Sequence, residues 1–160
     1  MRLHQLRRAL EPLIRRAMFV YWRYSRGATL GARAMVIDER DRIFLIRHSY
    51  VEGWHLPGGG VETGETLLEA LTRELAEEGN IVMTATPRLH GVFHNQRFSR
   101  RDHVALFVVR EFRQPSAPRP NHEIVAHGFF GRDELPNDTG RATRARIAEV
   151  FDAAPVSEIW

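Results

Sequence analysis

Three glutamates lie close together near the end of a segment whose apolar residues recur at helical spacing. Glu74, Glu77 and Glu78 fall in the last turns of this segment, which extends from residue 66 to residue 78. Like charges three or four residues apart each destabilise a helix by about 0.2–0.5 kcal/mol, and carboxylates in the last turn face the negative end of the helix dipole at a further cost of about 0.3–1 kcal/mol. A divalent cation would offset these costs, and oxygen ligands without cysteine suit Mg²⁺ or Mn²⁺ better than zinc. We therefore expect a metal site here, with the neighbouring Arg73 holding one carboxylate in place.

A helical projection of the same segment places these carboxylates against its apolar side. The projected stripe consists of Leu67, Leu68, Leu71 and Leu75. Glu78 falls inside this stripe and Glu74 at its border, whereas solvated charges would avoid both positions. An exposed acidic helix end is the alternative interpretation, and the conflict with burial argues against it. Upstream, the three glycines at residues 58–60 would let the backbone approach a metal or a phosphate, although such a run alone is also typical of a turn.

The glutamates belong to a longer motif that covers residues 59–81. It reads Gly59-x5-Glu65-x7-Arg73-Glu74-Leu75-Ala76-Glu77-Glu78-x-Asn80-Ile81. This motif resembles the Nudix box, G-x5-E-x7-R-E-U-x-E-E-x-G-U with U aliphatic, which is the signature of the Nudix hydrolase family. The one departure is Asn80, where the family has glycine, and asparagine is the residue that next best tolerates a left-handed conformation. The resemblance covers roughly residues 28–153 and implies the family's α/β/α sandwich with a mixed β-sheet.

The resemblance implies a metal-dependent hydrolase that cleaves the diphosphate linkage of a nucleoside diphosphate linked to another moiety. Position by position, Glu74, Glu77 and Glu78 match the family's ligands for Mg²⁺ or Mn²⁺, and the Gly58 carbonyl resembles its backbone ligand. Arg73 matches the arginine that orients the first of these glutamates. A Nudix-like sensor domain that binds a nucleotide without turnover is the alternative. Such domains usually lose part of the glutamate set, and this chain keeps it whole.

Two later segments supply further candidate residues. The family's general base is either a glutamate of the box or one from a later loop, and the loop candidate here is Glu123; a solvated loop glutamate is an equally good interpretation. Arg97, Phe98 and Arg101 offer cations for phosphates and a ring for stacking on a base, although an exposed loop would carry the same residues. The histidines, His48 among them, lack metal-ligand spacing and are expected to be structural or exposed.

The elements that must position these residues follow from the hydrophobic pattern. Apolar runs at residues 31–37 and 43–47, separated by a turn-rich segment, predict a β-hairpin, and the glycine-rich residues 54–60 predict a loop. Thr66 and Glu69 are spaced as a capping box for the central helix, which Asn80 should end. The remaining segments are predicted as strands at residues 88–94, 103–112 and 124–130, a proline-rich loop at 114–121 and a helix at about 141–153.

A separate amphipathic helix is expected before this domain. Its apolar stripe consists of Leu3, Leu6, Leu10, Leu13, Ile14 and Ala17, and Pro12 should kink it. We assign residues 1–27 to this basic helix and residues 28–160 to the Nudix hydrolase domain. The stripe favours packing on the domain or on a second subunit, which leaves a homodimer open. A peripheral membrane contact through the arginines is the less favoured alternative.

The charge distribution and the absence of cysteine narrow the class of protein further. All 23 basic residues are arginines, seven of them in residues 1–27 beside a single glutamate, so that segment carries +6 and the rest of the chain −3. The small net charge of the domain means that nucleic acid is not expected as its partner. The family resemblance implies a nucleotide-type small molecule instead. Without cysteine there is neither a disulfide nor a thiolate zinc site. The longest apolar run near the N-terminus has six residues, too short for a secretory or membrane-spanning segment, so we expect a cytoplasmic protein.

Overall fold

The computed structural model describes the backbone of residues 3–118 and 122–160, and the side chains of residues 11–118 and 122–160. The expected stripe residues Leu3, Leu6 and Leu10 and the end of the expected loop, residues 119–121, lie outside the described side chains. The elements are α1 (Leu3–Ser25), β1 (Thr29–Val36), β2 (Ile43–His48), β3 (Gly58–Gly60), α2 (Leu67–Gly79), β4 (Val82–Met83), β5 (Arg88–His94), β6 (Asp102–Val109), β7 (Phe112–Arg113), β8 (Ile124–Phe130), the short 3₁₀-helix η1 (Arg132–Glu134) and α3 (Arg141–Phe151).

The largest sheet has four strands in the order β3-β1-β6-β5. Its central pair, β1 and β6, is parallel over eight residues, whereas β3 and β5 join it antiparallel. The sheet is therefore mixed, as expected. The two central strands are rich in buried residues, because helices cover both faces of a sheet that contains a parallel crossover.

The predicted hairpin at residues 31–37 and 43–47 is wrong. β1 pairs with β3 and β6, whereas β2 pairs antiparallel with β8 in a separate two-stranded sheet. Only a single bridge between Ile37 and Ile43 joins the two runs. Both edges of β1 are already occupied by other strands, so β2 must find its partner elsewhere.

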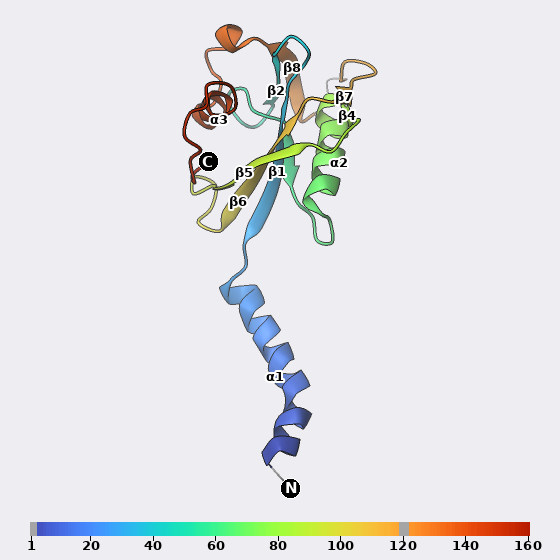
Figure 1. Ribbon diagram of the computed structural model, residues 1–160, viewed down its shortest axis with the longest axis vertical. Helices are drawn as coiled ribbons and strands as arrows, with labels where there is room; N and C mark the ends of the chain where they lie inside the picture. The colour runs from blue at the N-terminus through green and yellow to red at the C-terminus, as the bar shows by residue number, and fades with distance from the viewer. Residues whose placement is uncertain (1–2, 119–121) are drawn as a thin grey trace.

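Two helices enclose the strands from opposite sides (Figure 1). Along β1 the side chains alternate: Ala34 and Val36 pack in one buried cluster with leucines of α2, whereas Met35 and Ile37 pack in another with Ile147 of α3. Each face of the strands thus has its own core. This arrangement confirms the α/β/α sandwich.

The glycine-rich segment forms a strand where the sequence predicted a loop. β3 pairs with β1 so closely that a Cβ on Gly58 would collide with the carbonyl oxygen of Ala32, and the φ of Gly58 is +133°. Only glycine fits both the space and the dihedral angle. Gly58 therefore allows a strand pairing that a side chain at this position would prevent, and this strand lies next to α2.

Helix α2 has the predicted ends. Thr66 and Glu69 form the capping box, and Asn80 ends the helix in the left-handed conformation with φ 50° and ψ 38°. The departure from the glycine of the consensus therefore leaves the turn intact. The helical projection placed Leu68 in the buried stripe, but its side chain is 40% exposed. The buried arc is centred nearer to Leu71, so Leu68 lies beyond its edge.

Helix α1 extends away from the domain as one unbroken helix that continues through Pro12 (Figure 1). Residues 11–26 are all exposed. The expected packing of this helix on the domain is therefore absent from the part of α1 whose side chains are described. No helix of the described residues is both long and apolar enough to cross a membrane.

Replacing Leu71 tests which face of α2 stabilises the fold. Leu71 is fully buried, so Leu71→Ala should lower the free energy of unfolding by about 2–5 kcal/mol. The matched control is Leu68→Ala on the same helix, which should cost far less because Leu68 already contacts water. Urea denaturation of the two variants measures the difference, and equal losses would contradict the burial of this face.

Candidate active site

Arg73 connects the end of α2 to the glycine strand. Its Nε and Nη2 donate to the two carboxylate oxygens of Glu65 at 2.9 and 3.1 Å, and its Nη1 donates to Glu74 Oε1 at 2.7 Å. Nη2 also donates to the carbonyl oxygen of Gly60 at 3.1 Å. The hydrogen bonds with Glu65 and then Glu74 hold the pKa of Arg73 above its usual range, so the guanidinium stays charged. Arg73 thereby fixes the position of the Glu74 carboxylate.

Glu78 is a buried carboxyl that packs against the same strand. It is 5% exposed, and its Oε2 accepts a hydrogen bond of 2.6 Å from the backbone N–H of Gly58. Burial, together with a smaller contribution from the nearby charge of Glu74, raises the pKa of Glu78 to about 8, against the lowering effect of the Gly58 hydrogen bond. The carboxylate of Glu74 lies where a Cβ on Gly59 would be. Two acidic groups thus share one cramped space between α2 and β3.

This donor set suits a hard divalent cation. Glu74 and Glu78 bring two carboxyl groups, which repel each other when both are ionised, into a region of low exposure, and Glu77, whose side chain is 62% exposed, adds a third on the same helix. A divalent cation would remove the repulsion with oxygen ligands alone. Within residues 11–118 and 122–160, no three His, Asp or Glu side chains already surround a common point where a metal would bind. The ligand role of the Gly58 carbonyl stays a prediction.

A cavity of about 1000 Å³ is linked to the carboxylates through His48, a lining residue that lies 3.7 Å from Glu78. Arg33 of β1 lines it, and its Nη1 donates to the carbonyl oxygen of Leu56 at 2.6 Å. Burial lowers the pKa of Arg33, partly offset by the negative charges of Glu78 and Glu74. In the described part of the chain, no carboxylate lies within ion-pair distance of Arg33. A desolvated guanidinium without an ion-pair partner is costly, and an anionic ligand would relieve that cost.

Sequence reasoning missed Arg33, and it took His48 for a structural residue. The available signal was an arginine inside an otherwise apolar strand, a position that normally requires a partner. The Nε2 of His48 lies 3.7 Å from Glu78 Oε1, and its buried Nδ1 has no hydrogen-bond partner. Burial, and then the charge of Arg33, lowers the pKa of His48, so this histidine is neutral near pH 7 and its contact with Glu78 is not an ion pair. Both residues line the cavity.

Glu123 reaches the same region from the start of β8. The hydroxyl of Tyr50 donates to Glu123 Oε1 at 2.7 Å, and the Ser49 N–H donates to the Glu123 carbonyl at 2.8 Å. Desolvation of the phenol, and then the hydrogen bond to Glu123, raises the pKa of Tyr50 to about 12. Glu123 also contributes to the electrostatic field at Glu78 and His48. The later-loop glutamate and the glutamates of the box are therefore electrostatic neighbours.

The three loop residues expected to bind substrate separate into two groups. Arg97 and Phe98 line the large cavity, and Phe98 is 78% exposed. Arg101 instead donates from Nη1 to the Tyr24 carbonyl at 3.3 Å, at the junction with α1. This loop thus serves both the cavity and the base of the N-terminal helix.

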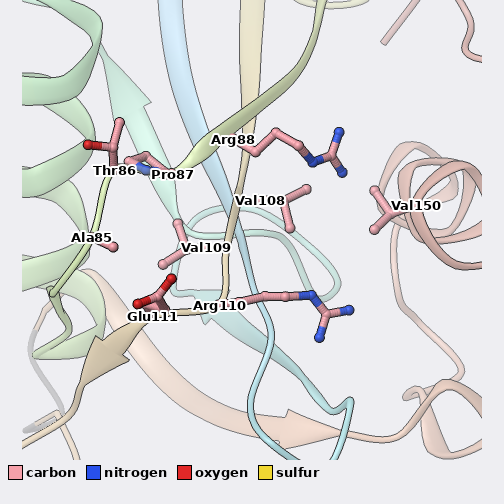
Figure 2. A pocket seen from close by; sticks show the side chains of 9 residues that line it. All are labelled: Ala85, Thr86, Pro87, Arg88, Val108, Val109, Arg110, Glu111 and Val150. Atoms are coloured by element: carbon pink, nitrogen blue, oxygen red, sulfur yellow. The ribbon is translucent and has the colours of Figure 1, made fainter.

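A second cavity of about 240 Å³ lies between the ends of β5 and β6 and helix α3 (Figure 2). Figure 2 shows the side chains of Arg88 and Arg110 directed toward α3, where Val150 lies. Its lining includes the carboxylate of Glu111 but none of the box glutamates. The lining of the larger cavity holds none of the box glutamates either, but it includes His48, which lies 3.7 Å from Glu78.

Comparison with known proteins identifies the family. The NUDIX domain family matches residues 27–151, and the chain belongs to the Nudix family. A solved MutT NUDIX hydrolase from Burkholderia pseudomallei superposes with a TM-score of 0.66 and 26% identity, covering 78% of this chain and 98% of that one. The fold of a UDP-X diphosphatase covers 94% of this chain and 80% of that chain, with a TM-score of 0.65 and 23% identity.

Curated relatives match over shorter stretches. A putative 8-oxo-dGTP diphosphatase of Bacillus subtilis (strain 168) is 34% identical over 76 residues, which are 48% of this chain and 50% of that protein. An RNA pyrophosphohydrolase of Legionella pneumophila (strain Corby) is 38% identical over 52 residues, 32% of this chain and 30% of that protein. The chain therefore spans half or less of the length of these relatives.

Replacing Glu78 should change how the stability of the metal-free protein depends on pH. The unfolded chain loses this proton near the ordinary pKa of 4.5, whereas the folded protein keeps it up to about 8. Between these values each pH unit upward favours unfolding by at most about 1.4 kcal/mol. Metal-free Glu78→Gln should therefore gain stability relative to the wild type as the pH rises through this window, because glutamine can still accept from Gly58.

Thermal melts of the metal-free proteins across this pH range provide the measurement. Glu77→Gln is the matched control, since the Glu77 side chain is largely in water and its replacement should leave the pH profile of the melting temperature unchanged. Parallel profiles for the wild type and Glu78→Gln would contradict the burial of this carboxyl.

Proposed function

We propose that the chain is a metal-dependent hydrolase that cleaves the diphosphate linkage of a nucleoside diphosphate linked to another moiety. The observation that carries the proposal is the buried Glu78 beside the Arg73-bound Glu74, next to a large cavity with the unpaired cation Arg33. Carboxylates on one side and a guanidinium on the other complement a metal-bound phosphate chain. The cavity volume suits a nucleoside-sized group.

The relatives support a phosphoanhydride substrate without choosing among nucleotides. Their names describe a diphosphatase for 8-oxo-dGTP and a pyrophosphohydrolase for RNA. Both activities break a bond between phosphates of a nucleotide, which is the chemistry that the carboxylate cluster suits. The expected cytoplasmic location stays a prediction.

Each residue of the cluster has a distinct proposed role. Mg²⁺ or Mn²⁺ would supply positive charge against the phosphate oxygens and make a water molecule more acidic. Glu74, Glu77 and Glu78 would hold the metal, with the Gly58 carbonyl as a backbone ligand. Arg73 keeps Glu74 in position through its hydrogen bonds to Glu65 and Gly60.

Two glutamates compete for the role of general base. Glu123 has a carboxylate oriented by the hydroxyl of Tyr50, and its charge acts on Glu78. Glu78 lies closer to the glycine strand but accepts a hydrogen bond from Gly58. If Glu123 is the base, Glu123→Gln should lower kcat by about 100-fold or more and leave the affinity for Mn²⁺ unchanged.

Arg33 is proposed to bind a substrate phosphate, and Arg97 and Phe98 to contact the rest of the nucleotide at the cavity edge. Removing a charge-assisted hydrogen bond costs about 1.5–3 kcal/mol, so Arg33→Met should raise KM by about tenfold to 100-fold with a smaller change in kcat. Arg47→Met is the control, since Arg47 pairs with Asp138 at 3.4 Å and is half exposed. A KM for Arg33→Met equal to that of the wild type would contradict the proposal that Arg33 binds a substrate phosphate.

The activity itself is tested with a substrate panel in the presence of Mg²⁺ or Mn²⁺. The panel includes nucleoside triphosphates, 8-oxo-dGTP, sugar nucleotides, dinucleotides and 5′-triphosphorylated RNA, with release of phosphate or pyrophosphate as the readout. At least one compound should be turned over by the wild type and lose most turnover in Glu78→Gln. Binding of these nucleotides without turnover by the wild type would instead support the alternative, a sensor domain.

A further inference from the structure

Helix α1 presents a long surface that the domain does not cover. Every residue from 11 to 26 is exposed, and large apolar side chains are among them: Leu13 is 66% exposed, Tyr21 67% and Tyr24 76%. The contact with the domain in this part of the helix is the hydrogen bond from Arg101 to the Tyr24 carbonyl. Exposed apolar area of this extent marks an interaction surface.

The described part of α1 has two chemically different faces. Residues recurring at helical spacing form the apolar face, which consists of Leu13, Ile14, Ala17, Met18, Val20, Tyr21 and Tyr24. The other face carries Arg15, Arg16 and Arg23. Phe19 lies on the arginine side, where its ring packs edge-on against Trp22 at 6.1 Å. A single partner must therefore accept an apolar surface and several arginines at once.

We propose that α1 lies in the interface of an anionic lipid bilayer, with its apolar face toward the acyl chains and its arginines among the headgroups. Residues 1–27 carry +6, whereas residues 28–160 carry −3. The helix is therefore attracted to an anionic surface that repels the domain, and the domain stays in water. The proposal does not depend on the hydrolase activity.

Other occupants match the two faces less well. A second copy of α1 would bring another +6 charge against this helix, so the apolar contact would form against strong repulsion. RNA would pair with the arginines but leave the apolar face in water. A bilayer surface accommodates both faces, and the helix is too polar to cross it.

Trp22 provides a reporter inside α1. Its ring is 38% exposed, and the Arg26 guanidinium lies over it at 5.6 Å. Tryptophan prefers the interface of a bilayer, where its emission shifts to shorter wavelength as water is excluded. The shift should disappear in Trp22→Phe, while that variant still binds.

The test uses the full chain with vesicles of phosphatidylcholine alone or of equal parts of phosphatidylcholine and phosphatidylglycerol. Flotation should recover the protein with the anionic vesicles, much less with the neutral ones, and less still at high salt. Leu13→Glu/Tyr21→Glu and Arg15→Glu/Arg16→Glu should each weaken anionic-vesicle binding by more than about tenfold. Val82→Glu and Arg40→Glu/Arg113→Glu are matched controls on the domain surface and should bind as the wild type does.

The same samples distinguish the competing occupants. Equal binding to both vesicle types, or none to either, overturns the proposal. So does a dimer in multi-angle light scattering that Leu13→Glu/Tyr21→Glu converts to monomer while vesicle binding is absent. Binding of a single-stranded RNA oligomer that depends on Arg15 and Arg16, without binding to vesicles, would assign the helix to RNA instead.

Discussion

The close approach of β3 to β1 and α2 is the constraint on which the site depends. A Cβ on Gly58 would collide with the backbone of β1, and a Cβ on Gly59 would overlap the Glu74 carboxylate. The space gained lets the Gly58 N–H reach Glu78 and the Gly60 carbonyl reach Arg73. Acidic groups that helix energetics alone would disfavour are therefore held together by contacts with a neighbouring strand.

Positive charge is divided between two separate places in the molecule. Arg33 and other arginines, Arg97 among them, line the large cavity, where an anion between Arg33 and a metal would interact with both. A second set lies on α1, outside the domain that contains the cavity (Figure 1). The two proposed ligands differ accordingly: a small phosphorylated molecule for the cavity and an extended anionic surface for α1.

The sequence predicted the parts of the fold that local rules determine. The capping box, the left-handed Asn80, the exact bounds of β5 and β8 and the family motif all follow from short-range spacing. The strand partners of β1 and β2 and the strand at the glycines could not be predicted in this way. Strand pairing depends on which strand edges are free in three dimensions, and a glycine allows two backbones to approach closely without making them do so. Arg33 was missed for the same reason: its neighbours across the cavity come from distant segments.

Binding of Mn²⁺ to the metal-free protein tests the account most directly. Isothermal titration calorimetry of the wild type should detect a site that Glu74→Gln and Glu78→Gln each weaken by about tenfold or more, since each removes a charged oxygen donor. Glu62→Gln, an exposed change just after the glycine strand, should bind as tightly as the wild type. Unchanged affinity in both Glu74→Gln and Glu78→Gln would contradict the assignment of this carboxylate cluster as the metal site.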